Sequence, residues 1–276
     1  KYLEREINII SKLSHPAIMK FIGYNMKDFK GKPKPIIITE FVPNGSLEDI
    51  LELGRRGCQN KDWDDTKKLI CIYGIAAGMS YLHHQDILHR DLKPANILID
   101  EYLFPKISDF GLSKNIDESN HLLSSGYKGT YAYSAPEIFN NEYTKAGDVY
   151  AFAIIVYEIM TGEFPYHNIL PFQLTLKIPR GFRPEFKFGI PMRYRNLIEE
   201  CWANNPEQRP TFDEIVEQLK TDQDFITDGV DGAEFLDYVD FIDESINESK
   251  IKCKDPILQN TSVELLDLKK YESSDQ

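Results

Sequence analysis

Three short segments hold most of the side chains that could do chemistry in this chain. Residues 89–96 read HRDLKPAN, residues 109–111 read DFG and residues 135–137 read APE. The first segment supplies a carboxylate at Asp91 and a compact positive charge at Lys93. Asn96 adds an amide oxygen and Asp109 a second carboxylate, and Mg²⁺ prefers such hard oxygen ligands when it also binds phosphates. These residue types could therefore bind a magnesium ion together with phosphate groups.

In this order, the motifs resemble the catalytic loop, the metal-binding turn and the end of the activation segment of eukaryotic protein kinases. A lone HRD triplet would be weak support, because Asp and Asn are also common turn residues. The linked set is far more specific. Residues 201–212, CWANNPEQRPTF, are similar to the tyrosine-kinase-like group, whereas Lys93 and Pro94 are typical of a serine/threonine catalytic loop. The resemblance covers about residues 1–219.

This resemblance implies a serine/threonine protein kinase that uses ATP and Mg²⁺ and phosphorylates a protein substrate. Asp91 would accept or orient the proton of the substrate hydroxyl, and Lys93 would contact the transferring phosphoryl group. Asn96 and Asp109 would complete the catalytic set as the ligands of Mg²⁺.

The first 42 residues resemble the back half of a kinase N-lobe. Apolar side chains at helical spacing predict a helix over residues 2–13, and β-rich runs predict strands at residues 18–24 and 35–42. The fold class expected is α+β and protein-kinase-like, with a truncated N-lobe (helix C and the last strands) and a complete, mainly helical C-lobe. The resemblance assigns these residues to the nucleotide site: Glu6, Thr39, Glu40, Val42 and Leu98.

Nothing in this chain precedes Lys1, so the glycine-rich loop and the strand-three lysine that would pair with Glu6 are absent from it. Lys1 cannot replace that lysine, because it would lie on the same helix as Glu6. Two readings follow from this departure: a piece of a longer active kinase, or a truncated pseudokinase or scaffold. A pure interaction module is a third, but retention of the four catalytic residues argues against it.

The C-lobe pattern includes two long helices. Residues 66–83 have an amphipathic pattern, and residues 148–160 are apolar nearly all round, which predicts a buried helix. The resemblance implies that Asp148 anchors the catalytic loop and that Glu137 and Arg209 form a buried bidentate ion pair. It also implies that His89 and Phe110 stack with Ile10 and Phe21, a reading that coincides with ordinary core packing.

Regulation by phosphorylation is a further expectation. Arg90 precedes the catalytic Asp, as in kinases whose activation segment is ordered by a phosphate, and a phosphoserine accepts strong hydrogen bonds from arginine. Ser124 and Ser125 are the candidate acceptors, although Tyr127 and Thr130 are also available. The resemblance gives Thr130 a hydrogen bond to Asp91 and Lys93. Ser124 and Ser125 could instead be ordinary loop residues with no regulatory role.

Charge divides the chain. Residues 221–276 hold 15 Asp and Glu against five Lys, which is −10 of the net charge of −12. We expect a kinase domain at 1–219, with a partial N-lobe at 1–42 and the C-lobe at 43–219, and an acidic, partly disordered tail at 220–276. The simplest reading of the tail is a solvated linker, and the alternatives are docking on a regulatory partner or leading into another domain.

Composition narrows the partners and the compartment. The chain is 42% hydrophobic but has no apolar run of about 18 residues, so no membrane span is expected. A basic footprint for nucleic acid is also missing. The four cysteines are scattered singly, which is typical of free thiols in a reducing compartment, so a cytoplasmic protein is expected.

Overall fold

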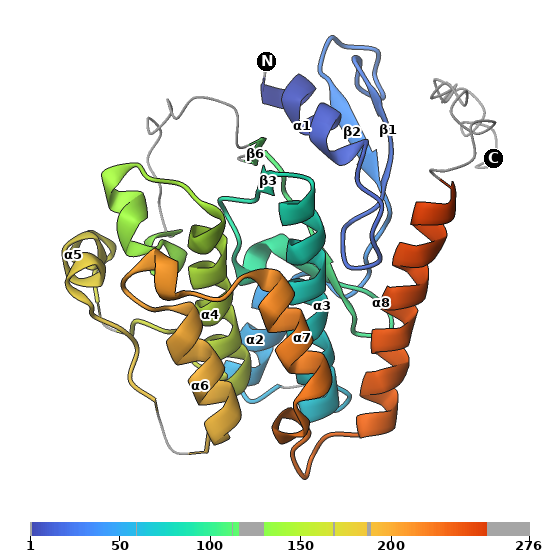
Figure 1. Cartoon of the computed structure of the whole chain (residues 1–276). Coiled ribbons are helices and arrows are strands. Elements are labelled where there is room, and N and C mark those ends of the chain that lie inside the picture. Colours follow the sequence, from blue (N-terminus) through green and yellow to red (C-terminus); the bar gives the residue numbers. More distant parts are fainter. Residues whose placement is uncertain are drawn as a thin grey trace.

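The structure is a computed structural model, and it describes residues 2–58, 60–111, 113–115, 130–167, 169–186 and 189–252. Figure 1 shows a small N-terminal part, made of one helix and a hairpin, above a larger helical lobe. This arrangement confirms the expected kinase-like class with a partial N-lobe and a mainly helical C-lobe.

The N-terminal part contains α1 (Tyr2–Ile10) and an antiparallel pair, β1 (Phe21–Asn25) and β2 (Ile36–Thr39). The helix ends three residues earlier than its apolar stripe predicts. Lys12 and Leu13 instead donate to the carbonyls three residues back, the tightening that often ends a helix. The strands also differ from the β-rich runs, since β1 begins three residues later than residue 18 and β2 ends three residues before residue 42. An irregularity in register between Phe21 and Gly23 lies within the pair.

Within the described residues, the larger lobe contains the following elements before its last helix. They are α2 (Leu47–Arg55), α3 (Asp65–His84), β3 (Ile87–Leu88), η1 (Pro94–Asn96), β4 (Ile97–Ile99), β5 (Pro105–Ile107), β6 (Lys114–Asn115), α4 (Lys145–Thr161), α5 (Pro171–Lys177), α6 (Met192–Cys201) and α7 (Phe212–Thr221). Short 3₁₀ turns connect them at Thr130–Tyr133, Pro136–Asn140, Ile178–Arg180, Pro206–Gln208 and Gln223–Phe225. β4 pairs with β5, and β3 pairs with β6, both antiparallel. Residues 89–96 therefore run from the end of β3 to the start of β4, and residues 109–111 follow the end of β5.

The core lies around α3 and α4. The burial of α4 on nearly all sides confirms the reading of residues 148–160 as an internal helix. The amphipathic pattern of residues 66–83 predicts a polar, solvent-facing side, and this prediction is wrong for most of α3. Every residue from Leu69 to Met79 is buried. The helix has no solvent face there, since α7 and α8 (Gly232–Lys252) both pack against it (Figure 1).

The solvated-linker reading of the tail is also wrong for residues up to Ile242. Phe235, Tyr238, Val239 and Ile242 are all at most 3% exposed, so α8 is part of the core rather than a solvated helix. The acidic side chains occupy the rest of its surface, which explains how a strongly charged segment can still pack. Residues 253–276 lie outside the described part of the chain. Among the described helices, none is both long and apolar enough to cross a membrane.

Candidate active site

The catalytic loop places Asp91 between two partners that come from the same loop. Lys93 Nζ donates to Asp91 Oδ2 at 2.7 Å, and Asn96 Nδ2 donates to the same oxygen at 3.1 Å and to the Asp91 carbonyl at 2.8 Å. Asp91 is 7% exposed, and its Oδ1 is buried with no hydrogen-bond partner within the described residues. Oδ2 is thus held by one cation and one amide, while Oδ1 has room in its hydrogen bonding to accept a proton.

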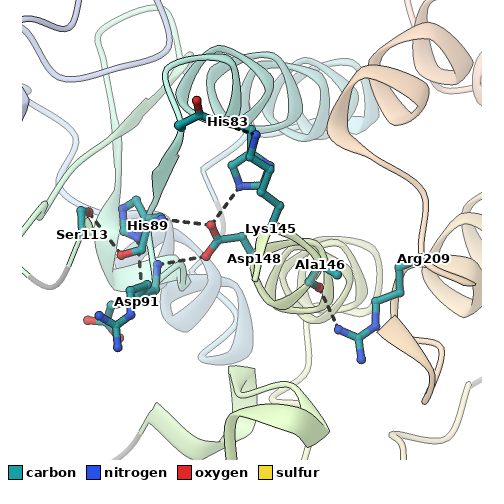
Figure 2. Close-up of polar contacts among 10 residues, drawn as sticks. His83, His89, Asp91, Ser113, Lys145, Ala146, Asp148 and Arg209 are labelled. Carbon is teal, nitrogen blue, oxygen red and sulfur yellow. Dashed lines mark hydrogen bonds and ion pairs between the residues drawn. The ribbon is translucent and has the colours of Figure 1, made fainter. Parts of the chain in front are cut away.

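Asp148 on α4 anchors this loop through its carboxylate (Figure 2). Its carboxylate accepts hydrogen bonds from the backbone N–H groups of His89 and Arg90, at 3.0 and 2.9 Å, and pairs with the ring of His83 at 3.0 Å. Burial by itself would raise the pKa of Asp148, but the His83 hydrogen bond and nearby positive charge more than offset it and hold the pKa below its usual range. The anchoring role expected for Asp148 is therefore present in the geometry.

Strained backbone accompanies this anchor. Arg90 has φ of 69° and Asp109 has φ of 60°, in the left-handed region that non-glycine residues rarely adopt. At Arg90 the N–H bond to Asp148 stabilises the unusual conformation. At Asp109 the side chain accepts a hydrogen bond from the Gly111 N–H at 3.2 Å. Such strain is found preferentially at functional sites.

The two metal-ligand candidates flank the β4–β5 hairpin at its open end, where the first residue of β4 pairs with the last residue of β5. Asn96 directly precedes β4, and Asp109 follows β5 by two residues. The Ser108 N–H donates to the Asn96 carbonyl at 2.9 Å, and its hydroxyl donates to the same carbonyl at 3.0 Å, which joins the two ends. Asp109 is exposed, as a group that meets a ligand must be.

This donor set fits Mg²⁺. Asn96 uses its Nδ2 on Asp91, so its amide oxygen is left for a cation, and Asp109 offers a hard carboxylate. No cluster of three or more His, Cys, Asp or Glu suited to a metal is found in the described ranges. Two protein ligands are nevertheless a normal complement for Mg²⁺, which keeps waters and substrate phosphates in its remaining positions.

Glu6 on α1 points toward the same turn. A methyl group at Gly111 would lie 3.2 Å from Asp109 Oδ1 and 3.9 Å from Glu6 Oε2, so the two carboxylates face one small space. Partial burial and the negative charge of Asp109 raise the pKa of Glu6. Two facing carboxylates favour a cation between them.

The segment assigned to adenine binding, residues 39–42, lies near β4, the strand that contains Leu98. Thr39 ends β2, and the following turn pairs with β4, because the Ile99 N–H donates to Gly45 and the Asn44 N–H donates to Ile99. Leu98 is half-buried between them. The Glu40 carboxylate is occupied by the Lys20 N–H at 2.7 Å and by Lys106 at 3.5 Å. Its side chain therefore braces the segment, whereas Val42 remains half-buried.

The expected stack of His89 and Phe110 is present. Their rings lie 5.5 Å apart at 56°, and both side chains are at most 1% exposed. His89 Nε2 is also 3.1 Å from the Ser108 carbonyl, so the ring connects the catalytic loop to the DFG turn. Ile10 is a buried member of the same hydrophobic core, and Phe21 is partly buried against that core.

Glu137 and Arg209 form the expected bidentate pair, with N–O distances of 2.7 and 2.8 Å. The Arg209 side chain is 0% exposed. Its remaining donors reach the carbonyls of Ala146 and Ala203, and Figure 2 draws the first of these. Because each of its three nitrogen atoms donates, Arg209 joins the end of the activation segment to α4 and to the loop after α6.

Sequence reasoning placed Arg90 but missed its neighbour. The guanidinium lies 3.8 Å from the ring centre of Tyr143, and Arg90 Nε is buried without a hydrogen-bond partner within the described residues. The two form one wall of a cavity of about 230 Å³ beneath the activation segment. Ser124 and Ser125 lie outside the described residues, as does the side chain of Thr130.

A second missed group is Glu158, on the apolar helix α4. Its side chain is 2% exposed and accepts hydrogen bonds from Tyr133 and Arg55 at 2.5 and 2.6 Å. The signal was available, since Glu158 is the second carboxylate, after Asp148, in the nearly all-apolar run 148–160, and a buried carboxylate must find partners. The sequence pattern could not say which residues those partners are.

Comparisons with known proteins agree with this geometry. The sequence model of a family described as "Protein tyrosine and serine/threonine kinase" matches residues 1–219. The chain is 38% identical over 226 residues to "Probable serine/threonine-protein kinase drkC" of Dictyostelium discoideum, an alignment that covers 79% of this chain and 29% of the relative. It is 34% identical over 218 residues to "Serine/threonine-protein kinase STY17" of Arabidopsis thaliana, covering 78% of this chain and 36% of that relative. The chain thus spans about a third of the length of these relatives.

Proposed function

Since the chain belongs to the family of protein tyrosine and serine/threonine kinases, we propose that its protein transfers the γ-phosphoryl group of ATP to serine or threonine hydroxyls of a protein substrate. The observation that carries the proposal is the Asp91 carboxylate. One oxygen is held by Lys93 and Asn96, and the other is buried and without a partner within the described residues. A hydroxyl that entered this site would satisfy it.

The reaction requires a proton acceptor and positive charge around the transferring group. Asp91 Oδ1 accepts the proton of the substrate hydroxyl as the oxygen attacks the γ-phosphorus, and the bond from that phosphorus to the bridging oxygen of ADP breaks. Lys93, held 2.7 Å from Asp91, supports the developing negative charge. General-base assistance of this kind contributes about 10²–10⁴-fold to the rate.

Asn96 and Asp109 would hold Mg²⁺, which when bound neutralises the phosphate charge of ATP. The hydrogen bond from Asn96 Nδ2 to Asp91 keeps the amide oxygen turned away from Asp91. The bonds from Ser108 to the Asn96 carbonyl keep the two candidate ligands in a fixed relation. This chain's residues therefore supply the proton acceptor, the cation beside it and two metal ligands.

Serine or threonine is favoured as the acceptor by two features. Lys93 and Pro94 follow Asp91 in the loop, and the relatives above carry the words serine/threonine-protein kinase in their names. A cytoplasmic location is part of the proposal, because Cys58, Cys71 and Cys201 are free thiols. A truncated pseudokinase or scaffold remains the alternative that the assay below separates.

The test is a substitution that leaves the fold intact. Asp91→Asn keeps the size of the side chain but removes the base, so we expect phosphate transfer to fall by about 10²–10⁴-fold. Asp86→Asn is the matched control, because Asp86 is exposed on the turn before β3 and pairs only with the partly exposed Lys145 within the described residues. Equal turnover in both variants and the unaltered protein would reject the role of Asp91.

A further inference from the structure

The helix α8 lies beyond the segment that the family model matches, yet it is built into the lobe. The match ends at residue 219, whereas α8 runs along α3 at residues 232–252 (Figure 1). Its buried residues, Phe235, Tyr238, Val239 and Ile242, are spaced three and four apart and form one face. This face has a defined partner in α3.

Specific contacts fix α8 on α3. The rings of Phe235 and Tyr238 meet Tyr73 edge to face, at 5.6 and 6.2 Å between centres. At the start of the helix, the Asp231 N–H donates to Thr66 Oγ1 at 2.8 Å. Glu234 also pairs with Lys67 at 2.6 Å. Aromatic packing and a hydrogen bond together define one register for α8.

Tyr238 extends these contacts to the β4–β5 hairpin. Its ring lies 4.5 Å from that of Phe104, the residue that precedes β5. A methyl group on Gly74 of α3 would overlap both the Tyr238 hydroxyl and the Pro105 ring, so the three meet without spare room. Lys67 adds to the joint, because its Nζ lies 5.0 Å from the centre of the Phe104 ring.

The hairpin in turn carries the candidate metal ligands and binds the nucleotide segment. Ile99 donates its N–H to Gly45 at 2.9 Å, beside the segment assigned to adenine. Ile107 donates to Ala17 at 2.8 Å, and Ser108 donates to Asn96 at 2.9 Å. Any displacement of the hairpin would therefore alter both the spacing of Asn96 and Asp109 and the position of the adenine segment.

A cavity at this joint shows how near α8 comes to the nucleotide segment. It has a volume of about 340 Å³, and its lining includes Tyr238 and Phe241 of α8, Phe41 and Val42 of the segment assigned to adenine, and Tyr102 and Lys106 of the hairpin. The helix and the segment assigned to adenine therefore line the same space.

We propose that α8 is a positioning element of the active site, with Tyr238 as its positioning residue. Through Phe104 and Pro105, Tyr238 holds the β4–β5 hairpin, and with it Asn96 and Asp109, against α3. The unit that supports the active site then extends to Ile242 rather than ending where the family match ends. This inference deepens the proposed kinase function and rests on it only for the meaning of Asn96 and Asp109.

Hydrogen exchange in the full chain tests the proposal directly. Tyr238→Leu removes the ring that contacts Phe104. Phe225→Leu is the matched control, because Phe225 is also a fully buried aromatic after residue 219 but packs on Tyr194 of α6 instead. Both variants lower the melting temperature. We expect Tyr238→Leu alone to speed exchange at the Ile99, Ile107 and Ser108 amides, by about tenfold beyond the control. Tyr238→Phe, which keeps the ring, should restore protection.

Two results would overturn the proposal: wild-type protection of the three amides in Tyr238→Leu, or equal loss in both variants. If Tyr238→Leu does not fold, Glu234→Gln replaces it, since it removes only the partly exposed ion pair with Lys67. That variant should speed exchange at the same amides about two- to fivefold, and no change there would reject the proposal. Exchange needs neither ATP nor turnover, so the result stands even if Asp91→Asn retains activity and the kinase proposal fails.

Discussion

The hydroxyl of Tyr133, just before the APE motif, donates a 2.5 Å hydrogen bond to Glu158, a carboxylate buried in the last turn of α4. Arg55 completes the cluster with a 2.6 Å ion pair to the same carboxyl group. The contact joins the segment that follows the catalytic loop to the core of the lobe. Burial raises the pKa of Glu158 to about 7, despite both partners.

This raised pKa makes stability depend on pH near neutrality. The folded protein keeps a proton on Glu158 up to about pH 7, whereas the unfolded chain releases it near the ordinary glutamate pKa of 4.5. The folded state therefore binds more protons between these values, and the free energy of unfolding should fall by about 3 kcal/mol as pH rises through the window.

Glu158→Gln should flatten this slope, because glutamine does not titrate. Its single amide oxygen replaces only one of the two carboxylate oxygens that accept from Tyr133 and Arg55, so the variant is also expected to be less stable at every pH. Thermal or urea unfolding at pH 5 and pH 8 measures the difference. Glu163→Gln on the same side of the lobe serves as a control for a general charge effect. An unchanged slope in Glu158→Gln would show that another group causes the pH dependence.

The ion pair of Glu137 and Arg209 predicts a large loss of stability when one partner is removed. Arg209→Met leaves the Glu137 carboxylate buried and unpaired, so we expect a cost of about 3–5 kcal/mol in the free energy of unfolding. Denaturant titration measures it. Arg195→Met, which breaks the exposed pair with Glu199 and the contact of its guanidinium with the Phe186 ring, should cost at most about 2 kcal/mol. Similar costs for both would contradict the buried role.

Arg90 predicts regulation by phosphate. Its guanidinium rests on the ring of Tyr143, and its Nε has no hydrogen-bond partner within the described residues, so an anion would be accepted there. We expect the active protein to carry phosphate on Ser124 or Ser125. Replacing both serines with alanine should lower activity without lowering the melting temperature. Two results together would contradict this prediction: full activity in the double-alanine variant, and mass spectrometry of the active unaltered protein that detects no phosphate on Ser124 or Ser125.

Asp109 predicts a specific dependence on Mg²⁺. Asp109→Asn keeps the hydrogen-bonding shape of the side chain but removes the charge that a hard cation prefers. The Mg²⁺ concentration for half-maximal activity should rise at least about tenfold, the loss seen even for groups that only support metal ligands. Glu101→Gln, on the exposed turn of the same hairpin, should leave it unchanged. A shift in both variants would indicate a general charge effect.

The sequence predicted those parts of the site that depend on residues close together in the chain. Asp91, Lys93 and Asn96 occupy one loop, so their contacts follow from the motif. The Glu137–Arg209 pair spans 72 residues and was predicted only through the family resemblance. Its geometry in the structure is a true confirmation, because composition and periodicity say nothing about such distant contacts.

The remaining errors have a common physical cause. The helical spacing of Phe235, Leu236, Val239, Ile242 and Ile246 predicts a short amphipathic helix, but periodicity does not identify the surface that covers its apolar face. The structure leaves Leu236 exposed and buries Tyr238 instead. The acidic composition then favoured a solvated linker over packing. For the same reason α3 was expected to have a polar face, which α7 and α8 in fact cover. Contacts such as Arg90 with Tyr143 depend on tertiary placement and had no local signal.

The most direct measurement of the central claim is transfer of a radiolabelled γ-phosphate from ATP to a serine- and threonine-containing protein, followed by identification of the labelled amino acid. The unaltered protein should place the label on serine or threonine, and Asp91→Asn should reduce it by about 10²–10⁴-fold while its melting temperature is kept. Label found at the same level in the Asp91→Asn variant, or no label with the unaltered full-length protein, would contradict the assignment.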